Sequence, residues 1–336
     1  MTSAKHIFTV DAHAGGEPVR IIVGGMPRIR GGSMAAKKRY VSENCDCVRS
    51  ALLHEPRGHK DMFGVVLTEP SHPDAELGMI FMDSGGYLNM CGHGIIGALT
   101  AAIEMGFIAG QEPSRRVVID TPAGLVEATA QVRDDVVIAV TVRNAPSFVF
   151  ASDVPIELPG RDCVSVDIAF GGNFVALVSA AQLGIAITPE NSPLIIETGM
   201  RLLGQVNRSV KVSHPLERHI NTVDLLEMFG EPRHPAADAQ NVVVFGRGSL
   251  DRSPCGTGTC AKMAALHAKG KLRVMEEFTH ESIIGTLFKG RIVGQTNVGE
   301  FEAIVPEITG NGFVIAVGQF IINPHDPLRD GFLMSA

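Results

Sequence analysis

The sequence predicts an α+β protein built from two homologous halves, and three observations support this prediction. Strand-like apolar runs outnumber helical patterns, and turns rich in Gly, Pro and Asp separate most of them, which argues against a doubly wound parallel sheet. Residues 90–106 recur as residues 254–270 at an offset of 164, from Cys91 to Cys255 and from Gly106 to Gly270. Residues 10–16 also resemble residues 166–172, at an offset of 156. Two features in the same order in both halves indicate duplication.

The expected elements follow from hydrophobic periodicity. Six runs have the pattern of strands: residues 7–10, 19–23, 65–68, 79–82, 117–119 and 136–142. Four segments have helical spacing: residues 34–53, 92–105, 194–206 and 256–269. Residues 145–160, which contain three prolines, are interpreted as a link between the halves. We therefore expect a first half of residues 1–145 plus 318–336 and a second half of residues 146–317.

Bulk composition limits the class of protein. The chain has 336 residues, 45% of them hydrophobic and 19% charged, which is enough for a sizeable core. Its net charge of −7, without a long basic run, argues against nucleic acid or an anionic membrane surface as a partner. The N-terminus has no apolar signal region, and no apolar run approaches the roughly 20 residues of a membrane span. We expect a cytoplasmic protein.

Each copy of the longer repeat places a cysteine, Cys91 or Cys255, at the start of a predicted helix. The unpaired N–H groups and partial positive charge at a helix N-terminus lower the pKa of a thiol there. The glycines that follow, at 92 and 94 and at 256 and 258, allow the backbone to approach an anion such as a carboxylate. If each sulfur lies about 3.5 Å from one reacting carbon on opposite faces, the sulfurs are about 7 Å apart.

The other four cysteines are interpreted as small buried hydrophobes: Cys45, Cys47, Cys163 and Cys260. Six cysteines in a chain of this length are too few for a disulfide scaffold, so we expect reduced thiols. Cys45 and Cys47 have no second ligand pair with metal-binding spacing, so no metal is expected. The Gly-x-Gly segments lack both the Lys of a P-loop and the third Gly of a dinucleotide fingerprint.

The two halves differ beside their cysteines. By the offset of 164, His93 corresponds to Thr257, and Asp251 corresponds to Tyr87. A carboxylate on one side only suits a cationic amine, and His93 suits a hydrogen bond to a carboxylate or control of thiol protonation. The ordinary alternatives are a turn residue or ion pair for Asp251 and a helix-start residue for His93.

Two segments of the sequence resemble the signature boxes of the proline racemase family: residues 90–94 (Met-Cys-Gly-His-Gly) and residues 251–259 (Asp-Arg-Ser-Pro-Cys-Gly-Thr-Gly-Thr). Six further stretches agree with the family and extend the resemblance over essentially the whole chain: residues 13–20, 55–59, 120–124, 170–174, 280–290 and 326–332.

The resemblance implies a diaminopimelate-epimerase-like fold, in which two pseudosymmetric halves each curl a β-sheet around a central helix and the active site lies in the cleft between them. It also implies a homodimer that inverts the C2 of an imino acid with two bases and no cofactor. Cys91 and Cys255 would then be the acid–base pair, and Asp251 would meet the ring nitrogen. The carboxylate site would be lined by Gly92, His93, Gly256 and Thr257.

Three activities follow from the resemblance: proline racemisation, 4-hydroxyproline 2-epimerisation and trans-3-hydroxy-L-proline dehydration. Dehydratases of the family typically carry Thr at the second cysteine, so Cys255 argues against dehydration. The positions that match the ring-contacting residues are Phe63 and Phe245. Two phenyl rings favour proline, because burying a ring hydroxyl without a partner costs roughly 1–3 kcal/mol; alternatively, either ring is simply part of the core.

Two other classes of protein remain as rivals. A catalytically silent imino-acid-binding protein would need no second thiol. A dithiol redox protein would use reversible oxidation of Cys91 and Cys255 as its working cycle, whereas oxidation would inhibit a racemase.

Overall fold

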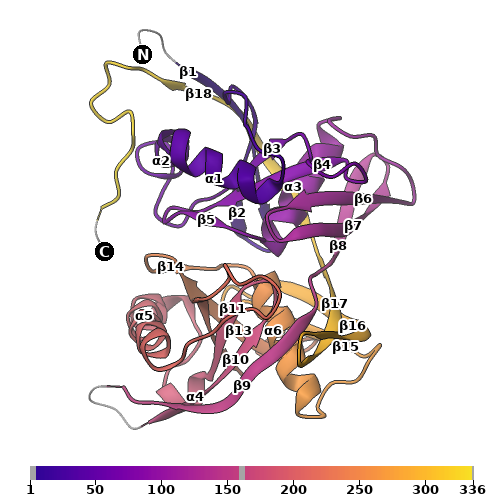
Figure 1. Ribbon diagram of the computed structural model, residues 1–336, viewed down its shortest axis with the longest axis vertical. Coiled ribbons are helices and arrows are strands. Elements are labelled where there is room, and N and C mark those ends of the chain that lie inside the picture. Colours follow the sequence, from indigo (N-terminus) through magenta and orange to yellow (C-terminus); the bar gives the residue numbers. More distant parts are fainter. Residues whose placement is uncertain (1–4, 159–162, 335–336) are drawn as a thin grey trace. The chain divides into compact units, whose positions relative to one another are not determined.

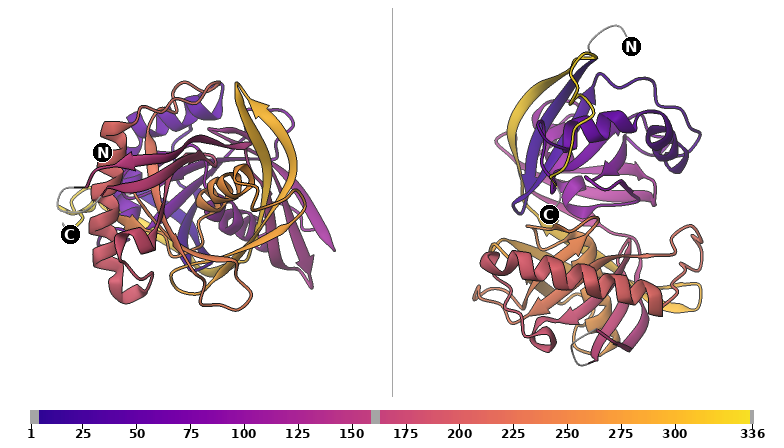
Figure 2. Two further views of the ribbon diagram at one scale, coloured as in Figure 1. Left: turned by 90° about the horizontal axis from the view of Figure 1, so that it is seen from below. Right: turned by 90° about the vertical axis from the view of Figure 1, so that its left-hand side faces the viewer.

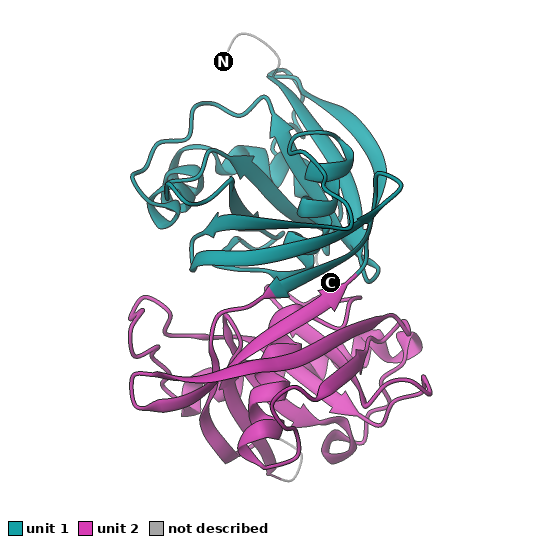
Figure 3. Ribbon diagram, turned by 90° about the vertical axis from the view of Figure 1, so that its right-hand side faces the viewer, with its two compact units in different colours: residues 1–142, 311–336 teal, residues 143–310 magenta. Residues whose placement is uncertain are grey.

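The computed structural model describes residues 5–158 and 163–334 (Figure 1). The chain divides into two compact units, residues 1–142 with 311–336 and residues 143–310 (Figure 3).

The described residues of the first unit form nine strands and three helices. In chain order they are β1 (Lys5–Ala14), β2 (Glu17–Gly24), α1 (Met34–Asn44), α2 (Asp46–Leu53), β3 (Phe63–Thr68), β4 (Leu77–Met82), β5 (Tyr87–Leu88), α3 (Gly92–Glu104), β6 (Ser114–Thr121), β7 (Gly124–Arg133), β8 (Val136–Arg143, whose last residue belongs to the second unit) and β18 (Gly312–Ile322). Outside these strands, Glu55 and Phe332 form an isolated antiparallel bridge.

The second unit repeats the plan. In chain order its elements are β9 (Ser147–Ile156), β10 (Val164–Phe170), β11 (Phe174–Ser179), α4 (Ala180–Leu183), a 3-10 turn (Pro189–Asn191), α5 (Ser192–Ser209), β12 (Val223–Gly230), β13 (Ala239–Phe245), β14 (Ser249–Leu250), α6 (Gly256–Ala268), β15 (Glu277–Glu281), β16 (Leu287–Val298) and β17 (Phe301–Gly310). Figure 2 shows α5 lying lengthwise along the outside of this unit, where it packs against β12 and β13.

Strand pairing is the same in both units. An antiparallel hairpin (β1–β2 or β10–β11) leads to a parallel neighbour (β3 or β12), then to an antiparallel strand (β4 or β13) that pairs in parallel with β6 or β15. The helices inserted before the parallel neighbour differ: α1 and α2 in the first unit, α4 and α5 in the second. The shared pairing matches the duplication predicted from the sequence.

A third internal repeat lies in equivalent loops of the two units. Residues 69–73 and 231–235 both read Glu-Pro-x-His-Pro, at an offset of 162. Asp120 Oδ2 accepts the backbone N–H groups of Ser71 and His72 at 2.7 and 2.9 Å. Glu281 Oε2 accepts those of Arg233 and His234 at 2.6 and 2.9 Å. Each loop is therefore tied to its sheet by a buried carboxylate.

Strand register corrects part of the sequence alignment of the halves. Gly64 pairs with Met82 in one unit and Leu226 with Val244 in the other, so these strands follow an offset of 162 rather than 164. The offset of 164 would match Phe81 with Phe245, but the strand register makes Phe81 equivalent to Val243. In the following hairpin Tyr87 pairs with Met82 as Leu250 pairs with Val244, which makes Leu88, not Tyr87, the counterpart of Asp251. The hairpin turns differ in length, and a constant offset cannot register that.

A central helix fills the sheet of each unit. Helix α3 is buried from Gly92 to Ile103 and packs on β1, β2, β3, β7 and β18. Helix α6 is buried from Gly256 to Ala265 and packs on β9, β10, β11, β16 and β17. Small residues make this close packing possible: a Cβ on Gly97 would lie 2.5 Å from Val19 Cγ1. Both N-termini are therefore held by the strands around them.

Most predicted elements are confirmed, and three expectations are wrong. The segment 34–53 forms two helices that meet at Cys45, because Asp46 starts a second helix and binds Arg49 within it. Residues 147–156 of the expected link form a strand paired with β10, while Pro159 and Gly160 lie outside the described residues. Cys45 and Cys260 are buried as expected, but Cys47 and Cys163 are exposed. None of the described helices is long and apolar enough to cross a membrane.

Candidate active site

The first unit presents Cys91 as the N-cap of α3. Its backbone is extended (φ −152°, ψ 119°), and its sulfur accepts the N–H of Gly94 at 3.4 Å. His93 follows, with its ring Nδ1 3.1 Å from the same sulfur. Gly94 cannot easily carry a side chain, because a Cβ there would lie 3.1 Å from Phe63 Cε1. The sequence Cys-Gly-His-Gly thus places a thiol, an imidazole and the first backbone N–H groups of the helix in one turn.

Phe63 lies against this head. It is the first residue of β3, and its ring meets the His93 ring edge-on at a centroid distance of 4.5 Å. Both side chains are buried. The contact fixes the plane of the imidazole beside the Cys91 sulfur. Phe63, one of the two predicted ring-contacting residues, therefore lies next to His93.

The second unit repeats the N-cap with a different backbone. Cys255 caps α6, and its sulfur accepts the N–H of Gly258 at 3.3 Å. Its φ is +58° and its ψ 111°. A residue with a Cβ rarely adopts such a φ, and holding it there costs on the order of 1–3 kcal/mol. Outliers of this kind concentrate at functional sites, so the strain itself draws attention to Cys255.

Asp251 and Ser253 lead into this cap. Asp251 Oδ1 accepts the backbone N–H of Ser253 at 2.8 Å and its hydroxyl at 2.7 Å. The Ser253 hydroxyl oxygen in turn accepts the N–H of Cys255 at 3.1 Å. All three residues are buried. Asp251 is therefore coupled to the Cys255 backbone through one serine, which the sequence argument did not single out.

The remaining predicted residues lie in the same two places. Gly92 begins α3, and Gly256 and Thr257 begin α6. Phe245 ends β13 and belongs to the apolar cluster that contains Cys255 and Leu225. Of the other predicted residues, the structure places three near Cys91 or its helix start (Phe63, Gly92 and His93) and four near Cys255 (Phe245, Asp251, Gly256 and Thr257).

A buried polar cluster joins α6 to strands β12, β13 and β15, and none of its residues was predicted from the sequence. It contains Glu227, Asn241, Thr259, Lys262 and His280, all with less than a tenth of their surface exposed. Burial raises the pKa of Glu227 to about 7, against the opposing effect of the Lys262 charge. Burial lowers the pKa of Lys262 to about 8, although Glu227 favours its charged form. Its Nζ lies 2.9 Å from the ring centroid of Phe229.

This cluster left a signal in the sequence that is clear in retrospect. Glu227 interrupts the apolar strand Leu-Leu-Glu-Met-Phe, and Asn241 begins the run Asn-Val-Val-Val-Phe. A charged or amide side chain inside a strand that is otherwise apolar must find a buried partner. The expectation for Cys260 agrees with the structure: burial raises the pKa of its thiol to about 12, as suits a structural residue.

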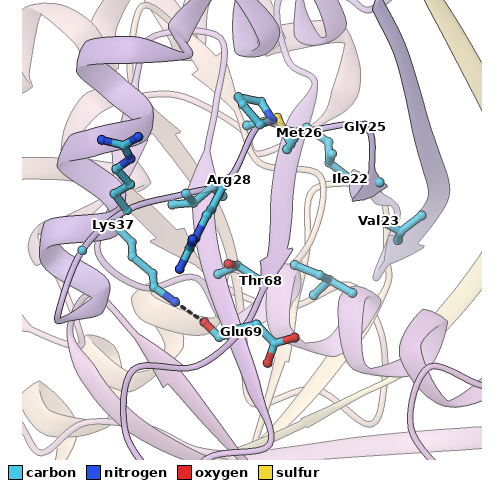
Figure 4. Close-up of a pocket in the computed structure, with 14 residues that line it drawn as sticks. Ile22, Val23, Gly25, Met26, Arg28, Lys37, Thr68 and Glu69 are labelled. Atoms are coloured by element: carbon cyan, nitrogen blue, oxygen red, sulfur yellow. Dashed lines mark hydrogen bonds between the residues drawn. The ribbon is translucent and has the colours of Figure 1, made fainter.

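Two cavities lie away from these residues. One, of about 780 Å³, is lined in the first unit by residues 22–31, Lys37 and residues 67–69 (Figure 4). There the Lys37 ammonium donates to the Glu69 carbonyl oxygen. The other, of about 470 Å³, is lined in the second unit by residues that include His267 and Gln295. Neither contains a predicted site residue, so size alone does not locate the chemistry.

The fold and the paired caps define a class: racemases and epimerases of the diaminopimelate-epimerase-like fold, with a cysteine at the head of each central helix. A family model described as proline racemase matches residues 9–333. The chain belongs to the proline racemase family, and the family and fold class predicted from the sequence are confirmed.

The chain is similar to the following three proteins, among others. A proline racemase of Clostridioides difficile is 50% identical over 334 residues, covering 99% of this chain and 100% of the relative. A 4-hydroxyproline 2-epimerase of Streptosporangium roseum is 39% identical, covering 98% and 99%. The crystal structure of a hydroxyproline epimerase from Agrobacterium vitis, with bound trans-4-hydroxy-L-proline, superimposes with a TM-score of 0.94 at 34% identity, covering 99% and 96%.

Proposed function

We propose that this protein is an isomerase that inverts C2 of proline, with Cys91 and Cys255 as its two bases. One observation carries the proposal: each sulfur caps a buried helix and accepts the N–H of the third helical residue, at 3.4 Å in α3 and 3.3 Å in α6. An N–H donor and the helix dipole both stabilise a thiolate over a thiol. The chain thus offers two equivalent bases, which a two-base inversion of one stereocentre requires.

The proposed reaction moves one proton off C2 and another onto it. One thiolate takes the C2 proton and becomes a thiol, while the opposite thiol gives its proton to the other face and becomes a thiolate. The electron pair left on C2 in between is shared with the substrate carboxylate. Amide N–H groups at the two helix starts would stabilise that charge as it grows. The chain supplies base, acid and anion stabiliser, so these steps call on no cofactor and no metal.

Binding roles follow from the chemistry of the remaining residues. Gly92, Gly256 and Thr257 offer backbone N–H groups of the first helical turns to the carboxylate. His93 lies close enough to Cys91 to influence the protonation of that thiol, with Nδ1 at 3.1 Å. Asp251 is the acidic group nearest in sequence to either cysteine, and we assign it the ring ammonium. Its bonds to Ser253 hold the carboxylate in place.

Proline is the proposed substrate, and 4-hydroxyproline is the alternative for the same mechanism. Phe63 and Phe245 are buried beside the two heads and offer no hydrogen-bond partner to a ring hydroxyl. A hydroxyl buried without a partner costs roughly 1–3 kcal/mol. The higher identity to a proline racemase, 50% against 39% to a 4-hydroxyproline epimerase, points the same way. Cys255 keeps dehydration of 3-hydroxyproline the least favoured activity.

Assembly and location complete the proposal. We propose a homodimer, supported by a row of apolar side chains that β18 exposes in the first unit. It comprises Phe313, Ile315, Val317 and Ile321, which are 55, 60, 71 and 56% exposed. Such rows mark protein interfaces. Light scattering should then give about twice the chain mass of 35.7 kDa. All six cysteines are free thiols, which suits the reducing cytoplasm.

The test is a side-by-side assay in heavy water. Purified protein is incubated with L-proline, trans-4-hydroxy-L-proline and trans-3-hydroxy-L-proline, and optical rotation and deuterium at C2 are followed. We expect loss of rotation with L-proline, faster than any change with the two hydroxyprolines, together with uptake of deuterium. A silent binding protein would leave C2 unlabelled. Thiol titration addresses the redox alternative: oxidation should abolish activity, whereas a dithiol redox protein would cycle through the oxidised form.

A further inference from the structure

The backbone of Cys255 differs from that of Cys91 in one torsion. The two residues share nearly the same ψ, 111° and 119°, but their φ values are +58° and −152°. Rotation about φ sets the orientation of the preceding peptide group. For Cys255 that group carries the carbonyl of Pro254. Whatever fixes the Pro254 carbonyl therefore fixes φ of Cys255 and the direction of its side chain.

Two buried side chains hold that carbonyl. Asn241 Nδ2 donates to the Pro254 oxygen at 2.7 Å, and the Thr259 hydroxyl donates to it at 3.1 Å. Both residues are completely buried. A carbonyl oxygen has two lone pairs, and here each is met by a donor that sits on a rigid element, strand β13 or helix α6.

His280 completes this arrangement from β15. Its Nδ1 lies 3.0 Å from Thr259 Oγ1 and 3.4 Å from Asn241 Nδ2. Its Nε2 faces Glu227, with Oε1 at 3.9 Å. Burial and the Lys262 charge lower the pKa of His280 to about 3, so the ring stays neutral. With its proton on Nδ1 it donates to Thr259, whose own proton is then directed at Pro254.

The equivalent positions of the first unit carry apolar side chains instead. Strand register pairs Leu77 with Ile119 as it pairs Ala239 with His280, so the counterparts of Asn241 and His280 are Met79 and Ile119. The counterpart of Thr259, by the helix offset of 164, is Ile95. These three side chains are apolar and completely buried. Polar side chains that hold the residue before the cysteine are thus found in the second unit, where the cysteine has a positive φ.

We propose that Asn241, Thr259 and His280 are positioning residues that hold the Pro254 carbonyl and thereby aim the Cys255 sulfur for proton transfer. The inference rests on the proposed function for what the sulfur does, but its geometric part concerns Cys255 alone. None of the three touches the substrate in this account. They act through the peptide that precedes the thiol.

The test is Thr259→Val, which removes the hydroxyl and keeps the shape. Misplacing a reacting group by about 1 Å costs roughly 10- to 100-fold in rate, so we expect a fall of this size in kcat for proline, with little change in KM. Alkylation of Cys255 by iodoacetamide should slow relative to Cys91, as measured on both peptides of the same sample by mass spectrometry. Thr259→Ser, which retains the hydroxyl, should restore both values.

The matched control is Thr100→Val in α3. Thr100 is also completely buried and donates within its helix to the Ile96 carbonyl at 2.8 Å, but it does not hold the residue before Cys91. This variant should leave the ratio of the two alkylation rates unchanged. Asn241→Leu gives a second test should Thr259→Val fold poorly, and the same slowing at Cys255 is expected.

Unchanged kcat and an unchanged alkylation ratio in Thr259→Val would overturn the proposal. So would equal slowing at both cysteines, which would indicate general loosening of the protein. If the wild-type protein isomerises none of the three imino acids while the ratio still falls, the proposed function fails and the positioning of Cys255 stands.

Discussion

The N-termini of α3 and α6 both present a capping cysteine, but different residues surround the two sulfurs. In both, a cysteine sulfur accepts the N–H of the third helical residue. At α3 an imidazole lies beside the sulfur, and the surroundings behind it are apolar. At α6 a threonine replaces the imidazole, and a buried polar cluster supports the cysteine from behind.

The comparison separates the position of the thiol, which both copies of the fold share, from the residues around the thiol, which differ between the copies. The position of the thiol at the helix start is common to both halves, so it follows from the strand–helix framework. The means of tuning that thiol differ, because the two copies changed separately around one framework. In a racemase the two bases must exchange roles, so each needs its own support but not the same support.

The strongest test of this comparison is to remove one thiol at a time. Cys91→Ser and Cys255→Ser should each lower racemisation by roughly 10³-fold or more, because a hydroxyl is a far weaker base at neutral pH. In heavy water each variant should still label C2 of one proline enantiomer without inverting it, through its remaining thiolate. The two variants should label opposite enantiomers.

Cys47→Ser provides the control, since Cys47 is an exposed thiol of the first unit. It should racemise proline at the wild-type rate. Wild-type activity in either Cys91→Ser or Cys255→Ser would refute the two-base pairing. Labelling of the same enantiomer by both variants would show that the thiols do not serve opposite faces.

The second test concerns the buried charges under α6, whose counterparts in the first unit are Val65 and Ala98. Burial raises the pKa of Glu227 from 4.5 to about 7, so the native protein holds this proton more tightly than the unfolded chain does. The resulting stabilisation is complete below pH 4.5 and is lost as the pH rises through 7, by roughly 3 kcal/mol at most. Thermal unfolding should therefore show Glu227→Gln gaining stability relative to the wild type between pH 5 and pH 8.

Glu281→Gln is the matched control for that measurement. Glu281 is as buried as Glu227, but its carboxylate accepts two backbone N–H groups. Losing that carboxylate should cost stability at pH 8, opposite to the expectation for Glu227→Gln. A pH-independent difference between Glu227→Gln and the wild type would contradict the raised pKa.

Local pattern was enough to predict the framework, the two caps and the family. Cysteine followed by Gly-x-Gly and a small-residue helix is a local signal, and duplication doubled it. The φ of Cys255 was not predictable from local pattern. The Pro254 carbonyl that precedes it accepts from Asn241, which is distant in sequence, and His280, more distant still, contacts Thr259 and Asn241 rather than Pro254. For the same reason a fixed offset misassigned the counterparts of Phe245 and Asp251.

The break at Cys45 and the strand over residues 147–156 were missed for a related reason. No Gly or Pro marks the junction of α1 and α2. Pro146, Pro155 and Pro159 suggested a link, although β9, which contains Pro155, is paired with β10. In β9, pairing across the sheet outweighed local propensity. At Cys45 the second helix begins at Asp46, whose carboxylate binds Arg49 within that helix.

The smallest expected effect comes from making the head of α3 resemble that of α6. His93→Thr removes the ring whose Nδ1 lies 3.1 Å from the Cys91 sulfur and which Phe63 holds edge-on. Without that partner the thiolate of Cys91 loses its imidazole support, and its alkylation at pH 7 should slow roughly tenfold relative to Cys255. Mass spectrometry of the two alkylated peptides measures the ratio. Thr257→Ser, which alters the equivalent position of α6 without adding or removing a ring, should leave it unchanged. An unaltered ratio in His93→Thr would mean that the helix N-terminus alone activates Cys91, and that the two heads differ in structure but not in the way they prepare their thiols.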